Sequence, residues 1–233
     1  MADPDLTFVI FGAAAEVIKP IYSRYTDAEF ICLVNSSTPE YLPGTIISSA
    51  DEGYLQGIEA ALKQVSRESK LILVNGAVFQ DDNLFVAHTE EAVERMLSVG
   101  VLLPVSICQV VLREMLSRRS GRLINISSFR ANAPAKGTVI YSAIKSFGES
   151  FFSGLGIEYG RMDITSNSIA LGFADTRLLD KLPVEKVSQF KKSVCKRKFV
   201  PAEEFLRAID FLIKSEYLNG TVIDLDGGLE YLR

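Results

Sequence analysis

Tyr141 and Lys145 stand four positions apart in a stretch whose apolar spacing predicts a helix over 139–159. Residues at i and i+4 share one face of a helix, so the phenol and the ammonium should lie side by side. A free tyrosine has a pKa of about 10, and a neighbouring ammonium favours the phenolate and lowers that pKa. The pair can therefore pass a proton to or from the oxygen of a carbonyl or an alcohol.

Ser128 is a second candidate for the same chemistry. It lies thirteen positions before Tyr141 and follows the run Arg122–Ile126, which predicts a strand. A hydroxyl at the end of a strand can donate a hydrogen bond to a substrate oxygen and hold a carbonyl in place. Seen alone, these residues are equally consistent with a surface Tyr–Lys pair and a serine that caps a turn.

Short strand-like runs alternate with longer helical segments along the chain. The predicted strands are 7–11, 29–34, 45–48, 70–74, 122–126, 164–170 and 221–225, and the main predicted helices are 51–65, 89–116, 139–159 and 201–215. Such alternation predicts right-handed crossovers and a parallel sheet covered by helices on both faces. We therefore expect a single α/β domain over residues 1–233, a doubly wound Rossmann-type parallel sheet of about seven strands.

Ligands of such sheets bind beyond the carboxyl ends of the strands. There the sequence reads Asn75-Gly76-Ala77, Asn125-Ile126-Ser127-Ser128, Tyr141-Ser142-Ala143-Ile144-Lys145 and finally Asp226-Gly227-Gly228. In this order and spacing the motifs resemble those of the short-chain dehydrogenase/reductase family, closest in style to 3-oxoacyl-acyl-carrier-protein reductases. The resemblance extends over nearly the whole chain.

The resemblance implies an oxidoreductase that transfers a hydride between a nicotinamide dinucleotide and a ketone or alcohol. By resemblance Ser128, Tyr141 and Lys145 are catalytic, Lys145 also binds the nicotinamide ribose, and a substrate lid spans 176–198. The cofactor-binding residues that it implies are Gly12, Ala15, Val17, Asn35, Ser36, Asn75, Gly76, Tyr141, Lys145, Gly172, Phe173 and Thr176. The implied substrate is a small carbonyl compound or a 3-oxoacyl thioester on a carrier protein.

The chain departs from the family pattern in the first turn. The family has three glycines there, whereas this chain has only Gly12, with Glu16 and Ile18 at the other two places. A carboxylate repels a pyrophosphate, and a bulky side chain hinders close packing of helix on strand. We expect weakened or reshaped dinucleotide binding, although the helix amino terminus still offers N–H groups.

Gly100 and Leu171 are further departures. Gly100 stands where the family usually has an asparagine that helps to hold a proton-relay water. Backbone or water must then substitute for that side chain, or proton delivery must be slower. Leu171 replaces a usual proline, and we expect a small local effect.

The end of the second strand bears on the choice of nicotinamide. It reads Asn35-Ser36-Ser37-Thr38. An acidic residue there would bind the ribose 2′-hydroxyl of NAD and repel the 2′-phosphate of NADP. This neutral ending favours NADP(H) over NAD(H), although no arginine lies in the first turn.

The overall composition argues against several other classes. The formal net charge of −4 disfavours a nucleic-acid partner, and polar residues interrupt the apolar run 99–112, which predicts a buried helix and no membrane span. His88 is the only histidine, and Cys32, Cys108 and Cys195 lack metal-type or disulfide-type spacing, so no metal site is expected. These features predict a cytoplasmic protein with reduced thiols.

The family's members assemble through the helices that correspond to 89–116 and 139–159, so we expect a homodimer or homotetramer. The predicted contact residues are Phe147, Gly148, Phe151, Phe152, Gly154 and Gly156. The alternative is that the aromatic side chains face the chain's own core.

The segment 181–198 ends in a run of lysines and an arginine. It is either a solvated basic face or a surface for an acidic carrier protein or a phosphorylated or nucleotide-linked substrate. Arg130, two positions after Ser128, is either a surface residue or within reach of an anionic substrate.

The alternative to an enzyme is a cofactor-poor family member that serves as a structural or regulatory subunit of an oligomer. The residues Glu16, Ile18 and Gly100 favour this alternative.

Overall fold

One parallel sheet organises the chain. The structure is a computed structural model that describes residues 5–34, 40–174 and 183–229. Among these residues seven strands run in the order β3-β2-β1-β4-β5-β6-β7. The strands are β1 (Leu6–Phe11), β2 (Glu29–Val34), β3 (Thr45–Ser48), β4 (Lys70–Asn75), β5 (Gly121–Ser128), β6 (Ile164–Leu171) and β7 (Val222–Leu225). The predicted doubly wound fold is confirmed, and the strand order reverses between β1 and β4.

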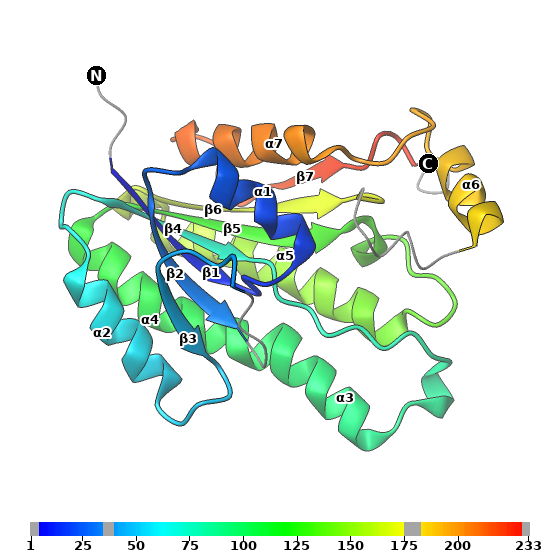
Figure 1. The fold of residues 1–233 in the computed structure, drawn as a ribbon, viewed down its shortest axis with the longest axis horizontal. Coiled ribbons are helices and arrows are strands. Elements are labelled where there is room, and N and C mark those ends of the chain that lie inside the picture. Colours follow the sequence, from blue (N-terminus) through cyan, green and yellow to red (C-terminus); the bar gives the residue numbers. More distant parts are fainter. Residues whose placement is uncertain (1–4, 35–39, 175–182, 230–233) are drawn as a thin grey trace.

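Helices cover both faces of the sheet (Figure 1). Helices α1 (Lys19–Arg24) and α7 (Ala202–Lys214) lie on one face. The other face carries α2 (Tyr54–Gln64), α4 (Leu103–Arg118) and α5 (Val139–Tyr159). Helix α3 (Glu90–Leu97) precedes α4, and α6 (Val184–Lys192) lies at the end of the molecule where β5 and β6 finish.

The core consists of two apolar layers, one on each side of the sheet. Side chains of β1 alternate between them, with Phe8 and Ile10 in the layer under α1 and α7, and Val9 and Phe11 in the layer under α2, α4 and α5. This period of two follows from the pleat of a strand that is buried on both faces. The two buried layers fix the positions of the central strands. Ligands of this architecture bind at the carboxyl ends of those strands.

The predicted helix 89–116 is one helical stretch with an irregular middle. Thr89 caps α3 by accepting a hydrogen bond from the Ala92 amide at 3.2 Å, and a π-helical turn, Ser98–Leu102, joins α3 to α4. By length and composition alone the stretch 90–118 passes as a membrane span, but its apolar face packs on the sheet, with Ile107 and Val111 buried. The predicted start of α2 at residue 51 is wrong, because a turn ending in left-handed Gly53 (φ 81°) precedes the helix.

The cysteines are all free thiols, as predicted. Cys32 and Cys108 are buried, and Cys195 is exposed. Burial raises the pKa of Cys32 to about 11 and raises that of Cys108 further. Both buried thiols are therefore protonated at neutral pH, and the cytoplasmic location stays a prediction.

The residues proposed for an oligomer contact divide into two groups. Phe152 is completely buried in the chain's own core, so its place in a contact is wrong, and added Cβ atoms at Gly148 and Gly156 would meet the chain's own Asn125 and Asn219. Gly154 has open space beside it. Ile157, one turn later on α5, is 82% exposed. An apolar side chain beside an open glycine suits close helix packing against a second copy.

We predict that Ile157→Arg converts a homodimer or homotetramer to smaller species, because the charge would be buried in the contact between α5 helices. Light scattering at micromolar concentration measures the mass. Val184→Arg, on the 79% exposed side chain of α6, is the matched control and should leave the mass unchanged. A wild-type protein of strictly monomeric mass would contradict the prediction.

Candidate active site

Helix α5 and the end of β5 bring the predicted catalytic side chains together. Ser128 is the last residue of β5, and Tyr141 and Lys145 lie one turn apart on α5. Ser128 lies close enough to Tyr141 to lower the pKa of its phenol, and the Lys145 Nζ lies 5.8 Å from the centre of the Tyr141 ring. The three groups therefore lie near one another at the carboxyl end of the sheet.

The ammonium group of Lys145 is buried beside β5. Its side chain is 9% exposed, and Nζ donates a hydrogen bond to the Ile126 carbonyl oxygen at 2.8 Å. Burial lowers the pKa of Lys145 to about 8, while the charge of Glu149 acts in the opposite direction. The bond ties α5 to the strand that carries Ser128.

The pKa of Tyr141 differs from the sequence-based prediction. Burial raises it above the usual value, and this effect exceeds the lowering by the Ser128 hydrogen bond and the charge of Arg130. Asp82 also raises it. The expectation that Lys145 lowers this pKa is wrong for the protein alone, because the lysine is directed at the Ile126 carbonyl and is itself desolvated.

Glu149 forms a buried polar network that the sequence analysis missed. The Ser127 hydroxyl donates a hydrogen bond to Glu149 Oε1 at 2.6 Å, and Asn132 Nδ2 donates to Oε2 at 3.4 Å. Burial raises the pKa of Glu149 most, with Asp224 adding to the rise and the Ser127 and Asn132 hydrogen bonds and Lys145 opposing it. Its position four residues after Lys145 is a signal that could have placed it on the same face of α5.

Gly100 is required by a neighbouring apolar side chain. A Cβ at Gly100 would lie 2.4 Å from Ile144 Cγ2, so a larger side chain does not fit without a shift. Ile144 belongs to a buried cluster with Met96 and Ile140, against which Tyr141 packs. The place where the family's asparagine would project is therefore occupied by hydrocarbon, and a polar group at position 100 cannot hold a relay water here.

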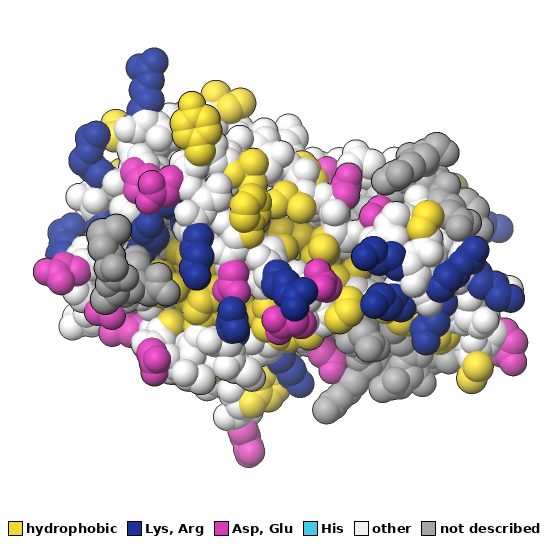
Figure 2. All heavy atoms as spheres, turned by 90° about the horizontal axis from the view of Figure 1, so that it is seen from above, with side chains coloured by type: hydrophobic (Ala, Val, Ile, Leu, Met, Phe, Trp, Pro, Cys, Tyr) yellow, Lys and Arg dark blue, Asp and Glu magenta, His cyan; other side chains and the backbone are white. Residues whose placement is uncertain are grey.

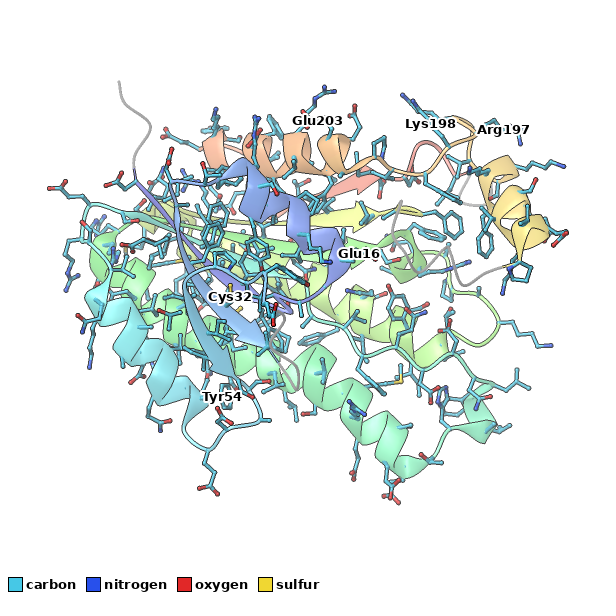
Figure 3. All side chains as sticks on the ribbon, in the orientation of Figure 1. Glu16, Cys32, Tyr54, Arg197, Lys198 and Glu203 are labelled. Atoms are coloured by element: carbon cyan, nitrogen blue, oxygen red, sulfur yellow. The ribbon has the colours of Figure 1, made fainter. Side chains whose placement is uncertain are left out.

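The turn after β1 keeps its tight bend, and the helix that follows it is short. Gly12 has φ +76°, and a Cβ there would lie 2.6 Å from the Ala77 backbone, so glycine is required. A single 3₁₀ turn, Glu16–Ile18, comes next, and the α-helix begins only at Lys19 and ends at Arg24. Glu16 stands at the amino-terminal end of this helical segment (Figure 3).

Ile18 fills the space that a glycine would leave open. It is completely buried, and its Cδ1 lies 2.7 Å from where a Cβ at Gly76 would stand. Over the same turn, the Tyr41 hydroxyl donates a hydrogen bond to the Ala14 carbonyl oxygen at 3.1 Å. The turn is thus closed by side-chain packing, and a six-residue α1 supplies little of the N–H array that holds a pyrophosphate.

The remaining predicted cofactor residues lie along the same crevice where the structure describes them. Asn75 ends β4, and its buried Oδ1 has no hydrogen-bond partner within the described ranges, while its Nδ2 donates to Asn125 Oδ1 at 3.0 Å. Gly172 and Phe173 follow β6. Ala15 and Val17 flank Glu16, and Asn35, Ser36 and Thr176 lie outside the described residues.

These residues fit the two halves of a nicotinamide dinucleotide unequally. At the ends of β4, β5 and β6, the orphaned Asn75 Oδ1 and the Ser128, Tyr141 and Lys145 side chains offer donors and acceptors suited to a nicotinamide riboside. The first turn, with Glu16 and a short helix, is a poorer match for a pyrophosphate. Reshaped phosphate binding thus remains the expectation.

A small cavity lies beside the residues that follow Ser128. It has a volume of about 230 Å³ and is lined partly by Phe129 and Arg130, the residues directly after Ser128. Two larger hollows, of about 600 and 620 Å³, lie elsewhere and include Glu29 and Asp5 near the amino ends of β2 and β1. Because ligands of doubly wound sheets bind at the carboxyl ends, the smaller cavity is a better candidate for a substrate site than these two hollows.

Comparison with known families and proteins agrees with this geometry. The family model described as short chain dehydrogenase matches residues 44–186. Carbonyl reductase family member 4 of Xenopus laevis is 28% identical over 230 residues, covering 95% of this chain and 96% of that protein. The 3-oxoacyl-[acyl-carrier-protein] reductase of Homo sapiens is 30% identical over 160 residues, covering 69% of this chain and 66% of that protein.

Solved structures share the fold at lower identity. A 3-oxoacyl-[acyl-carrier protein] reductase from Brucella melitensis has a TM-score of 0.82 and 18% identity, covering 97% of this chain and 92% of that one. A variant of actinorhodin polyketide ketoreductase with NADPH has a TM-score of 0.85 and 19% identity, covering 97% of both chains. At this identity the likeness shows the fold.

We predict that Lys145→Met changes how stability depends on pH. The pKa of Lys145 is about 8 in the folded chain against 10.5 for the free group, so the unfolded chain binds more protons between these values. Wild-type stability should therefore rise through this window as pH increases, by about 3 kcal/mol at most from this group. The variant lacks that contribution, and urea unfolding from pH 7 to pH 10 measures the difference between the two proteins.

Lys63→Met, at the exposed end of α2, is the control for this prediction. Its free energy of unfolding should follow the wild-type pH dependence in parallel. A constant difference between wild type and Lys145→Met at every pH would show that the Lys145 ammonium is not destabilised by burial.

Proposed function

This chain belongs to the short-chain dehydrogenase/reductase family, and on that premise we propose that it reduces a ketone with a hydride from NADP(H), or catalyses the reverse oxidation of an alcohol. The observation that supports this most is the proximity of Ser128, Tyr141 and Lys145 at the carboxyl ends of the strands. The ketone is a small carbonyl compound or a 3-oxoacyl group, including one on a carrier protein.

The protein's part in this reaction is orientation and proton transfer. When bound, the nicotinamide supplies the hydride that adds to the carbonyl carbon. Tyr141 gives its phenolic proton to the carbonyl oxygen, so that the C=O bond becomes an alcohol and the phenolate takes up a proton afterwards. Ser128, which lies close enough to lower the pKa of the same phenol, donates to that oxygen and fixes its position.

Lys145 acts on Tyr141 and on the cofactor ribose. Its ammonium is anchored on the Ile126 carbonyl and keeps further N–H donors for a ribose hydroxyl. In the protein alone Lys145 does not lower the pKa of Tyr141, so its stabilisation of the phenolate requires a bound cofactor and substrate that change the surroundings of the ammonium. The low pKa of Lys145, about 8, also suits a group that exchanges protons near neutral pH.

The preference for NADP(H) rests on the neutral end of the second strand, Asn35-Ser36-Ser37-Thr38. No carboxylate in that run would repel a 2′-phosphate. Glu16 and the short α1 weaken the hold on the pyrophosphate shared by both nicotinamides. We therefore propose weaker binding of both dinucleotides than the three-glycine turn would provide, with NADPH bound more tightly than NADH.

A second candidate function follows from the same departures. Ile18 fills the turn from within, Gly100 is closed by Ile144, and α1 spans six residues. Such a chain could serve as a structural or regulatory subunit of an oligomer without turnover. The polar groups of Ser128, Tyr141 and Lys145 argue against this, because a buried ammonium and phenol are costly to keep in a purely structural position.

We predict that Tyr141→Phe lowers kcat by about 10²- to 10⁴-fold with little effect on folding, because it removes the proton donor and keeps the ring. Turnover is measured with NADPH on a panel of 3-oxoacyl thioesters, small diketones and keto-sugars. Tyr159→Phe, at the end of the same helix, is the control and should keep full activity. An active wild type whose Tyr141→Phe variant turned over equally fast would disprove the mechanism.

We predict that Glu16→Gly tightens binding of both NADPH and NADH by about tenfold, the effect of relieving roughly 1.4 kcal/mol of charge repulsion. Titration followed by nicotinamide fluorescence gives both dissociation constants without a substrate. Glu68→Gln, in the loop before β4, serves as the control and should leave both unchanged. If Glu16→Gly left both affinities unaltered, the electrostatic account would fail, and a wild type that bound neither dinucleotide would support the non-catalytic role.

A further inference from the structure

The cavity that Phe129 and Arg130 help to line has largely apolar walls, and three of its lining residues are phenylalanines. The Phe173 ring stacks on Phe190 at 4.6 Å between centres and 15° between planes, and Phe129 is tilted against Phe173 at 5.0 Å. Leu229, at 3% exposure, completes the apolar lining. Such walls suit a flat hydrocarbon or aromatic body. A volume of about 230 Å³ admits only a small molecule.

Arg130 places one cation among these apolar walls. Its guanidinium carbon lies 4.5 Å from the centre of the Phe129 ring, and Nη1 donates a hydrogen bond to the Ala133 carbonyl oxygen at 3.2 Å. In the described ranges no carboxylate lies within ion-pair distance of Arg130. A guanidinium has five N–H donors in a planar fork, so most of them remain for a ligand.

The position of Arg130 relative to the reacting groups is also defined. Its backbone N–H donates to Ser128 Oγ at 3.2 Å, and its charge lowers the pKa of Tyr141. The Arg130 charge therefore acts on the pKa of the phenol that would donate to a carbonyl oxygen, and the charge of Asp82 acts on that pKa in the opposite direction. A substrate that contacts both Tyr141 and Arg130 carries its anionic group only a short distance from its carbonyl.

The surface around the cavity is basic although the whole chain is acidic. Lys and Arg side chains gather at the end of the molecule that carries α6 (Figure 2), and the labelled Arg197 and Lys198 lie there in Figure 3. Lys186 Nζ lies 5.9 Å from the centre of the Phe190 ring, which is a cavity wall, while Glu185 beside it is the opposing charge on α6. The net charge of the protein is −4, so this local field draws anions toward the cavity specifically.

We propose that this cavity, called the Arg130 pocket and formed by Phe129, Arg130, Phe173, Gln189, Phe190 and Leu229, binds a small carbonyl compound that carries a carboxylate. The aromatic walls hold its apolar body, and Arg130 binds the carboxylate through paired N–H donors. The placement of the substrate carbonyl on Tyr141 rests on the proposed function, whereas the binding of the carboxylate does not. Arg130 is then the residue that selects acids over neutral carbonyl compounds.

The test measures binding without hydride transfer. The probes are 3-phenylpropanoate and its neutral amide, titrated by calorimetry into wild type, Arg130→Met and Arg130→Lys. Loss of a charge-assisted hydrogen bond should weaken binding of the carboxylate to Arg130→Met by about 10- to 100-fold and leave the amide unaffected. Arg130→Lys keeps the charge without the planar fork, so its affinity for the carboxylate should be intermediate.

Arg95→Met is the matched control, because Arg95 also lies over a phenylalanine ring, that of Phe79 at 4.1 Å, but lies outside the pocket. Its affinity for the carboxylate should equal that of wild type. Should Arg130→Met fail to fold by circular dichroism, the acid-to-amide ratio of Arg130→Lys against wild type decides the matter. Equal binding of acid and amide by wild type, or tighter binding of phenylphosphonate than of the acid, overturns the proposal.

Turnover then separates this proposal from the proposed function. Benzoylformate and 4-oxo-4-phenylbutanoate are compared with their methyl esters in the presence of NADPH. Activity with no preference for the acids supports the reductase and overturns the Arg130 pocket. Absence of turnover combined with Arg130-dependent binding of 3-phenylpropanoate supports the pocket and counts against the reductase.

Discussion

The buried ammonium of Lys145 constrains how the structure is arranged at the carboxyl ends of the strands, where the candidate active site lies. A charged group in apolar surroundings must be hydrogen-bonded, and here the acceptor is the Ile126 carbonyl of β5 at 2.8 Å. That bond sets the position of α5 along the strand and therefore the meeting of Tyr141 with Ser128. Glu149, one turn further along α5, accepts a hydrogen bond from Ser127 and so joins α5 to β5 at a second point. These two bonds join α5 to β5, and further hydrogen bonds join it to other segments, among them those from Ser146 Oγ to the Ala131 carbonyl and from Ser153 Oγ to the Gly220 carbonyl.

Two glycines of this chain each lie opposite a branched apolar side chain. Ile144 occupies the space opposite Gly100, and Ile18 occupies the space opposite Gly76. In both pairs a glycine on one element is matched by a branched side chain on another, and the close packing of protein interiors keeps the pair complementary. The consequences differ, because the first exchange removes a polar position beside the catalytic helix and the second closes the turn that would face a pyrophosphate.

Charge is distributed unevenly around the crevice. The first turn carries Glu16, whereas the substrate side carries Arg130 and the lysines of α6 and the loop after it. An overall negative chain therefore has its positive field where a substrate enters and a negative group where phosphates of a dinucleotide would lie. The proposed recognition of an anionic substrate and the proposed weaker binding of the cofactor would both follow from this one distribution of charge.

The sequence by itself determined the α/β alternation, the sheet and the spacing of the predicted catalytic residues. Strands such as Phe8–Phe11 are apolar on both faces, and Tyr141 and Lys145 share a helix face at any orientation of that helix. It did not determine the pKa values, because burial of Tyr141 and the direction of the Lys145 ammonium depend on how α5 meets β5. Nor did it show that Ile144 fills the place left by Gly100, or that Arg130 lies among aromatic rings. Those contacts join segments far apart in sequence, and only tertiary packing brings them within a few ångströms.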